Sequence, residues 1–397
     1  MSPDTDQESH DLDLSENSTE QFKVAAREVD LIDLAARVLN LPSFITDRDT
    51  LANKTGRGYI SGAPSASYSL SSGLAAVVAA NGAFYMSEDT NAKISNVSTE
   101  AYITQKNQFV TNLQSNVWTS HNTYNILNDW RYYSYDQRTY GLGSNTQLNN
   151  YVNQTYNYVR LSQTILRTLS PNLFLGLGYG WDHHYNITEA ATAGAGINLY
   201  AYGITRSSTS AGVNLAFLFD DRVNSINPLG GDYVNVIYRP NLTVFGSDSD
   251  WQSLLIDARK YVPFPSNSEN ILAFWSYDWL TLSGKPPYLD LPSTQWDTYE
   301  NLGRGYIQGR FRGKDLLYLE AEYRFGILRN GLLGGVVFAN AQSVSGFPSD
   351  SFRKVYPAGG FGLRVKFNKY SRTNIAIDYG IGTGGSQGLF VNLGEVF

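Results

Sequence analysis

The sequence predicts an all-β protein, and three observations support this prediction. Among the 397 residues, aromatic side chains make up 14% and glycine occurs 36 times, a composition that suits pleated surfaces and many turns. From about residue 58 onward, apolar and polar residues alternate with a period of two, whereas helices repeat every three to four residues. The alternating segments run for about 9 to 14 residues, although strands of globular proteins average about five or six.

The composition also excludes several classes of protein. With hydrophobic residues at 42% and charged residues at 17%, the chain is expected to fold rather than to stay disordered. The absence of cysteine excludes a disulfide framework and a thiolate metal site. A net charge of -6 without a dense basic run argues against nucleic acid as a partner. No apolar run reaches the roughly 18 residues that a membrane helix needs.

The N-terminal region is expected to differ from the rest of the chain. Residues 1–17 are acidic and predict a disordered tail, and they do not resemble a signal peptide, which leaves a cytoplasmic protein or the mature form of an exported one. Ser18 and Gln21 then form a capping-box pair that opens an amphipathic helix, and Pro42 ends it. This helix either packs on its own domain or binds a partner protein. Its apolar face includes Phe22, Val29, Ile32 and Leu39.

The positions of the strands are predicted from the alternation of apolar and polar residues. In residues 316–325 the apolar Leu317 and Leu319 share one face, while Glu320, Glu322 and Arg324 share the other. Segments of this kind are expected at 62–70, 74–86, 94–105, 108–119, 124–135, 156–168, 172–185, 205–218, 233–245, 251–263, 271–282, 315–327, 332–343, 360–368, 373–382 and 388–397.

Long alternating strands predict a transmembrane barrel. Aromatic residues that would form its girdles lie near the strand ends, at Trp118, Trp130, Tyr132, Trp181, Trp275 and Trp279. A mean hydropathy of -0.29 fits a barrel with a polar lumen and polar loops. Short turns alternate with long loops, and an even strand number places both chain ends on the periplasmic side. We therefore expect a sixteen-stranded antiparallel barrel at 58–397, in the lipid of the bacterial outer membrane, preceded by a periplasmic helix and linker at 18–57.

The longest loop contains the stretch Gly-Arg-Gly-Tyr at 303–306, and here the sequence resembles the BamA/TamA-type outer-membrane assembly superfamily, including its bacterial surface antigen branch. In that family a sixteen-stranded barrel carries an Arg-Gly-Phe/Tyr motif in its sixth extracellular loop, which folds back into the lumen. Arg304, Gly305 and Tyr306 match this motif. Residues 64–78 are similar to the family's opening hairpin, and residues 389–397 to its last strand, which ends on an aromatic residue.

The sequence departs from the family pattern in two places. Residues 1–57 are too few for the POTRA domains that usually collect clients. Asn340 stands where the family usually has the aspartate that pairs with the loop arginine. Because a guanidinium prefers a bidentate carboxylate, the inward-facing Glu322 is the best candidate to pair with Arg304, and Asn340 is expected to accept one weaker bond. The alternative is that Arg304 faces water in a mobile loop.

The resemblance implies that the protein inserts or translocates polypeptides, with unfolded outer-membrane proteins as clients and a periplasmic or outer-membrane protein as a partner. A poorly paired seam between the first and last strands would expose backbone groups that template a client strand. The remaining alternatives are a passive pore, a structural subunit of an outer-membrane complex, and lipid transport or remodelling. The expected seam residues are Pro64, Tyr68, Leu70, Leu389, Val391, Leu393, Gly394 and Phe397.

Catalysis is not expected. Residues 384–388 match a Gly-x-Ser-x-Gly hydrolase pattern, but they lie between two alternating strands rather than in a strand-to-helix turn. The neighbouring Asp182, His183 and His184 would point to opposite faces of a strand, which does not suit a metal site. We therefore expect the protein to have no enzymatic activity and to bind neither a cofactor nor a metal ion.

Overall fold

The computed structural model describes residues 27–41, 59–69, 72–87, 92–190, 202–203, 205–222, 224–266, 268–347 and 349–397. Predictions for residues 1–17, for Phe22 and for Leu70 lie outside these residues. The strands are β1 (Tyr59–Ser69), β2 (Gly73–Phe84), β3 (Ser95–Thr104), β4 (Phe109–Trp118), β5 (Tyr124–Thr139), β6 (Val152–Ser170), β7 (Leu173–Ala190), β8 (Ser208–Asp220), β9 (Gly231–Asn241), β10 (Trp251–Pro263), β11 (Ile271–Gly284), β12 (Leu316–Gly326), β13 (Leu333–Val344), β14 (Tyr356–Asn368), β15 (Thr373–Gly382) and β16 (Gln387–Leu393).

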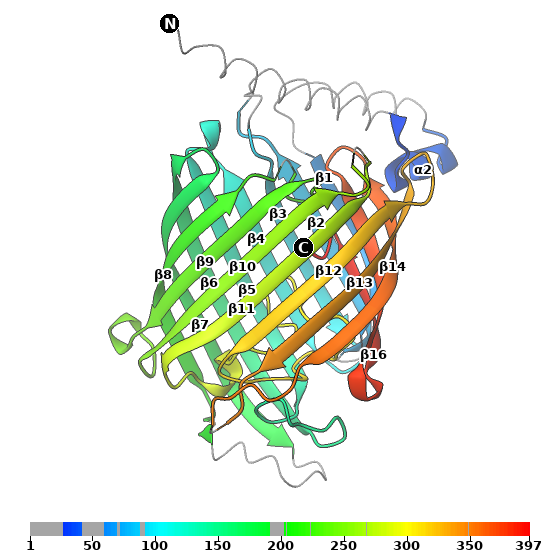
Figure 1. Ribbon diagram of the computed structural model, residues 1–397. Coiled ribbons are helices and arrows are strands. Elements are labelled where there is room, and N and C mark those ends of the chain that lie inside the picture. The colour runs from blue at the N-terminus through cyan, green and yellow to red at the C-terminus, as the bar shows by residue number, and fades with distance from the viewer. Residues whose placement is uncertain are drawn as a thin grey trace, which may run out of the picture.

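Each strand pairs antiparallel with the next one along the chain, from β1 to β16. The sheet curls around an interior (Figure 1), so that Cα atoms of β1 and β16 come within 8 Å of each other. The all-β prediction is confirmed. Strands β5, β6 and β7 run further than the alternation indicated. The segment predicted to end at residue 185 continues as β7 to Ala190, because β7 keeps pairing with β6 as far as Asn153.

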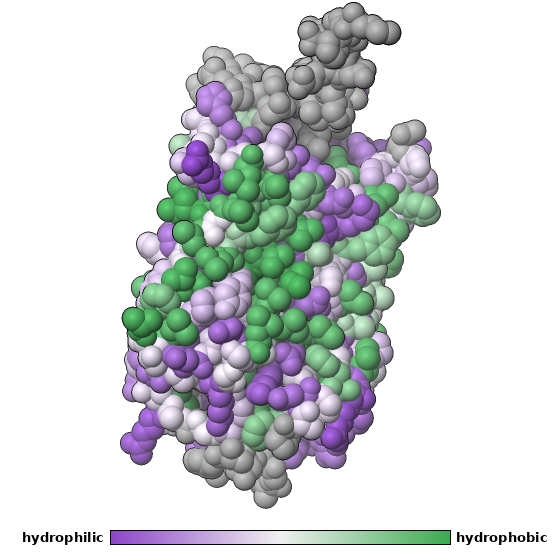
Figure 2. Space-filling view, turned by 60° about the vertical axis from the view of Figure 1, so that its left-hand side comes forward, coloured by the Kyte–Doolittle hydropathy of each residue, from purple (hydrophilic) through white to green (hydrophobic). Residues whose placement is uncertain are grey.

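The two faces of the sheet differ in polarity. Leu177, Leu319 and Phe361 point outward with 63%, 63% and 60% of their surface exposed, and Figure 2 shows apolar side chains gathered on one outer face. Trp118 and Trp275 were expected in aromatic girdles, but each is only 2% exposed and faces the interior, where its ring packs against Phe174 and Phe397 respectively. Among the described residues, no helix combines the length and the apolar character needed to cross a membrane.

The helix α2 (Leu31–Val38) begins at Asp30, whose side chain accepts a hydrogen bond from the Asp33 N–H at 2.8 Å. The prediction of one helix through Val29 is therefore wrong, because Asp30 is extended and caps a new helix. Val29 precedes this cap, and its N–H donates to the Asn330 carbonyl at 2.9 Å. Ile32 is half-buried in α2, whereas Leu39 follows the helix and is 67% exposed.

Charged contacts hold α2 and the residues before it on the end of β14 and on the connection that follows β14. The Lys369 ammonium lies 3.1 Å from the Asp33 carboxylate, and both side chains are 2% exposed. The Lys366 ammonium lies 2.6 Å from the Glu28 carboxylate. The Lys369 N–H donates to Asp30 at 2.8 Å. These contacts place α2 against its own domain, and binding of a partner protein by this helix stays a prediction.

Lys369→Met is expected to loosen α2, because it removes a buried cation that pairs with the Asp33 carboxylate. Breaking a buried pair in this way costs about 3 kcal/mol. Hydrogen exchange of residues 31–38 should accelerate in the variant, while Lys354→Met, which removes an exposed lysine, serves as the control. Unchanged exchange in Lys369→Met would show that the charged contacts do not hold the helix.

Candidate functional site

The connection between β11 and β12 folds into the interior of the curled sheet. Arg304, Tyr306 and Phe311 in this connection are 0%, 1% and 1% exposed. Gly305 has a φ of +104°, and a Cβ there would lie 2.9 Å from the Ala358 Cβ. A Cβ on Gly380 of β15 would lie 2.6 Å from the Gly305 nitrogen. Glycines at both positions therefore let the loop backbone lie against the wall.

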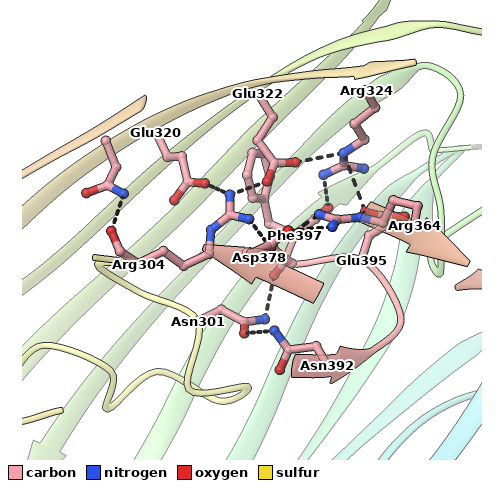
Figure 3. A network of polar contacts seen from close by, with 12 residues as sticks. Asn301, Arg304, Glu320, Glu322, Arg324, Arg364, Asp378, Asn392, Glu395 and Phe397 are labelled. Atoms are coloured by element: carbon pink, nitrogen blue, oxygen red, sulfur yellow. Dashed lines mark hydrogen bonds and ion pairs between the residues drawn. The ribbon is translucent and has the colours of Figure 1, made fainter. Parts of the chain in front are cut away.

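Three carboxylates surround the Arg304 guanidinium. Glu320 and Glu322 project from β12, and Asp378 projects from β15 (Figure 3). Every one of these side chains is fully buried. The guanidinium carbon also lies 3.8 Å from the centroid of the Phe338 ring, a cation–π contact. The structure thus places Arg304 inside the barrel beside the predicted Glu322, together with Glu320 and Asp378, which were not predicted as its partners.

Asn340 binds the main chain of Arg304 rather than its guanidinium, which was the expected partner. Its side-chain amide donates to the Arg304 main-chain carbonyl at 2.9 Å and does not accept from the guanidinium. The expected role of Asn340 is therefore wrong. The carboxylates of Glu320, Glu322 and Asp378 contact the guanidinium, whereas the Asn340 amide binds the loop backbone. Tyr306, the third residue of the motif, donates its hydroxyl to the Pro357 carbonyl at 2.6 Å.

The ion pairs continue beyond Arg304. Arg324 lies 2.8 Å from Glu322, and Arg364 lies 2.6 Å from Asp378 and 2.7 Å from Glu395. Burial acts to raise the pKa of Glu395, but Arg364 and Arg324 beside it lower that pKa below its usual value. Within this network cations and anions alternate, so that each of its buried charges has a partner of opposite sign.

The last residues of the chain also lie inside the barrel. Strand β16 ends at Leu393, and Gly394 has a φ of +113°. The Phe397 ring, 4% exposed, stacks on Trp275 with 5.1 Å between ring centroids. Arg324 donates to the Phe397 carbonyl at 2.9 Å. The prediction that the last strand and the seam reach Phe397 is therefore wrong, because the chain turns inward at Gly394.

The inward tail and the loop are tied to each other. The Asn301 amide donates to the Val396 carbonyl at 2.8 Å, and the Asn392 amide donates to the Asn301 side-chain oxygen at 2.8 Å. Asn301 thus links the loop both to the tail and to β16 (Figure 3). A displacement of the loop would therefore remove contacts of the last strand.

The remaining seam residues lie on two neighbouring strands. Leu389, Val391 and Leu393 belong to β16, which pairs with β15 over its whole length. Pro64 and Tyr68 belong to β1, where they pair with Val78 and Leu74 of β2. Within the described part of the chain, no residue of β1 is paired with a residue of β16. The two end strands are thus adjacent without a shared hydrogen-bond ladder.

The Gly-x-Ser-x-Gly match lies where β15 joins β16, and the cluster of Asp182, His183 and His184 lies in β7. Gly384 and Ser386 belong to the short connection between the antiparallel strands β15 and β16. His183 stacks between Trp181 and Tyr185, whereas His184 stacks on Tyr158, whose ring centroid is 4.3 Å away. Within the described residues, no three carboxylate or imidazole side chains form a group that could hold a metal ion.

Glu300 is a titratable residue of the loop. Its carboxylate accepts a hydrogen bond from the Tyr133 hydroxyl of β5 at 3.0 Å. Burial and the negative charge of Glu100 raise the pKa of Glu300 to about 7. The folded loop therefore favours the neutral, protonated form of this side chain.

The loop is expected to be held more weakly as the pH rises. Because the folded pKa of Glu300 is raised above that of the unfolded chain, the stabilisation is complete below about pH 4.5 and lost as the pH passes through about 7. Protease cleavage within residues 285–315 should be faster at pH 8 than at pH 5. Glu300→Gln keeps the neutral form at every pH and should flatten this difference. An equally steep pH dependence in the variant would assign it to another group.

Comparison with known proteins identifies the fold. No protein-family model and no curated protein matches the sequence. Among solved structures, BamA from Haemophilus ducreyi lacking POTRA domains 1–3 matches over 86% of this chain with a TM-score of 0.52 and 15% identity. The fold is that of the BamA and CdiB barrels. CdiB from Acinetobacter baumannii matches over 87% of this chain with a TM-score of 0.52 and 12% identity, and CdiB from Escherichia coli over 85% with a TM-score of 0.51 and 11% identity.

The match extends over only part of the BamA and CdiB chains. This chain spans 70% of the BamA structure and 66% and 62% of the two CdiB structures. At 11% to 15% identity the likeness concerns the arrangement of the strands rather than individual side chains. The loop, the tail and the ion-pair network are therefore described from this structure alone.

Proposed function

We propose that the chain closes into a sixteen-stranded transmembrane barrel in a bacterial outer membrane, where it inserts or translocates polypeptides through the seam between β1 and β16. The likeness to BamA and CdiB, which are outer-membrane proteins of Gram-negative bacteria, supports this location. The exposed leucine and phenylalanine side chains on the outer face suit contact with lipid. We expect no catalytic activity of the barrel itself.

The proposal rests on the difference in length between the two end strands, β1 and β16. Strand β1 has 11 residues and β16 has only 7, and the residues after Leu393 turn into the interior. Among the residues that the structure describes, part of the β1 edge therefore has no strand beside it to pair with. Unpaired backbone N–H and C=O groups are costly in lipid, so this edge favours pairing with an added strand. A client in an extended conformation would supply that strand.

The test locks the seam with a disulfide. The chain contains no cysteine, so one cysteine introduced in β1 and one in β16 form the only possible bridge. Wild-type protein in liposomes is expected to accelerate refolding of a urea-denatured outer-membrane barrel. Oxidation of the cysteine pair should abolish the acceleration, and reduction should restore it. An oxidised form as active as the reduced one would contradict insertion through the seam.

A passive pore or structural subunit of an outer-membrane complex is the second candidate. An interior cavity of about 230 Å³, lined by residues such as Arg160, Asp182 and Arg239, remains between the loop and strands β4 to β11. A barrel filled by its loop should show small, unsteady currents in a planar bilayer, whereas a large and steady wild-type current would support the pore. Lipid transport or remodelling through the same seam is a third candidate.

A further inference from the structure

A groove crosses the outward face of strands β8 to β13. It has a volume of about 740 Å³. The small side chains of Ala258, Ala321 and Ala339 line it, while Phe274 and Leu319 stand beside them with 43% and 63% of their surface exposed. The groove is therefore apolar along most of its length and opens away from the barrel interior.

One end of the groove carries an exposed ion pair. The Lys260 ammonium lies 2.9 Å and 3.2 Å from the two oxygens of Asp232, and the side chains are 60% and 41% exposed. Exposed pairs of this kind contribute little to the stability of the fold. Both charges are therefore available to other ions at small cost.

The register places the ion pair at the end of the barrel that carries α2. Asp232 is the second residue of β9, and Ala339 is the seventh residue of β13. Both strands begin at the end where α2 packs, since the strands alternate in direction and Val29 binds the connection before β13. The groove thus runs from the charged pair near one rim toward the middle of the wall, across strands that are tilted in Figure 1.

We infer that this groove binds one phospholipid with a zwitterionic ethanolamine headgroup, from the leaflet on the α2 side. The inference rests on the proposed placement in a membrane. The lipid phosphate would accept from Lys260, and its ammonium would donate to Asp232, so each charge of the headgroup meets its opposite. An acyl chain would lie along the alanines, where small side chains allow close approach to the sheet. A purely anionic headgroup would instead meet the Asp232 carboxylate at the same place.

Lipid retention tests the site. Wild-type protein is reconstituted in liposomes of equal phosphatidylethanolamine, phosphatidylglycerol and phosphatidylcholine, extracted in mild detergent, and examined by native mass spectrometry. Phosphatidylethanolamine should be enriched on the protein. Ala339→Leu, which fills the groove at an exposed position, and the double variant Lys260→Gln with Asp232→Asn should both lose this enrichment. The control double variant Lys314→Gln with Asp350→Asn removes another exposed pair, 2.9 Å apart, and should keep it.

Three results would overturn the inference. They are a bound lipid with the composition of the bulk mixture, enrichment of phosphatidylglycerol, and unchanged enrichment in both groove variants. Flotation and client refolding on the same liposomes separate this inference from the proposed function. A barrel that accelerates refolding but binds lipid without selection overturns the lipid site alone, whereas a barrel that does not float with liposomes overturns both.

Discussion

Arg304→Ala is expected to free the loop at residues 285–315 and to lower the free energy of unfolding by about 3 to 5 kcal/mol. The substitution removes the nearest cation from three carboxylates whose side chains are fully buried, Glu320, Glu322 and Asp378. Arg324 and Arg364 remain, but each already serves one of these acids and Glu395. The contact of the guanidinium with the Phe338 ring is lost as well.

Urea unfolding in detergent measures the loss of stability, and protease cleavage between residues 285 and 315 measures release of the loop. Arg353→Ala removes an exposed arginine and should change neither. The stability and the loop protection of Arg304→Lys should lie between those of Arg304→Ala and those of Arg353→Ala. An ammonium keeps the charge but lacks the planar fork that reaches several carboxylates. If Arg304→Ala unfolds at the wild-type urea concentration and its loop stays protected from protease, the ion pairs do not hold the loop.

The same variant bears on the choice between the two candidate functions. If the loop fills the barrel, its release in Arg304→Ala should enlarge the bilayer current relative to wild type. A large and steady current already present in the wild type would leave the loop without a role as a plug and would favour the passive pore.

The strands could be predicted because alternation depends on local sequence alone. The predicted segments 251–263 and 373–382 coincide with β10 and β15, and the other described strands begin or end within a few residues of the prediction. The departures occur where pairing outlasts the alternating pattern, as in β7, whose end at Ala190 depends on β6 beside it. Pairing between strands is a tertiary property that no single segment encodes.

The partners of Arg304 show a similar limit. Glu320 shares the inward face of β12 with Glu322, so the alternation contained enough information to predict it as a second partner of Arg304. Asp378 lies on the polar face of its own segment, but β15 is separated from β12 by two strands. Its approach to Arg304 depends on the curvature of the sheet and on the depth of the loop, neither of which can be read from the sequence.

The inward tail could not be predicted for a further reason. Leu389, Val391 and Leu393 continue an alternation that predicts a strand to the end of the chain. Gly394 is one of the expected seam residues, but a glycine in a sequence does not reveal whether its φ is negative or positive. The contacts that stabilise the turn, with Trp275 and Arg324, come from strands on another part of the wall.

Phe397→Ala is expected to release this tail from the barrel interior. The ring is 4% exposed, and removal of a buried phenylalanine side chain costs about 3 to 5 kcal/mol of local packing. Stacking on Trp275 is lost, while the hydrogen bond from the Asn301 amide to the Val396 carbonyl is kept. Hydrogen exchange of residues 387–397 should accelerate, whereas Phe352→Ala, at a residue 43% exposed, serves as the control.

Gly394→Ala is expected to release the same tail by straining the backbone at the turn. A Cβ there would meet no heavy atom within 4 Å, so the substitution acts only through its φ of +113°, at a cost of about 1 to 3 kcal/mol. If the tail restrains β16, both variants should accelerate client refolding, because the freed strand can separate from β1 more readily. Faster exchange together with an unchanged refolding rate would contradict this restraint and would leave the tail as a filling of the interior.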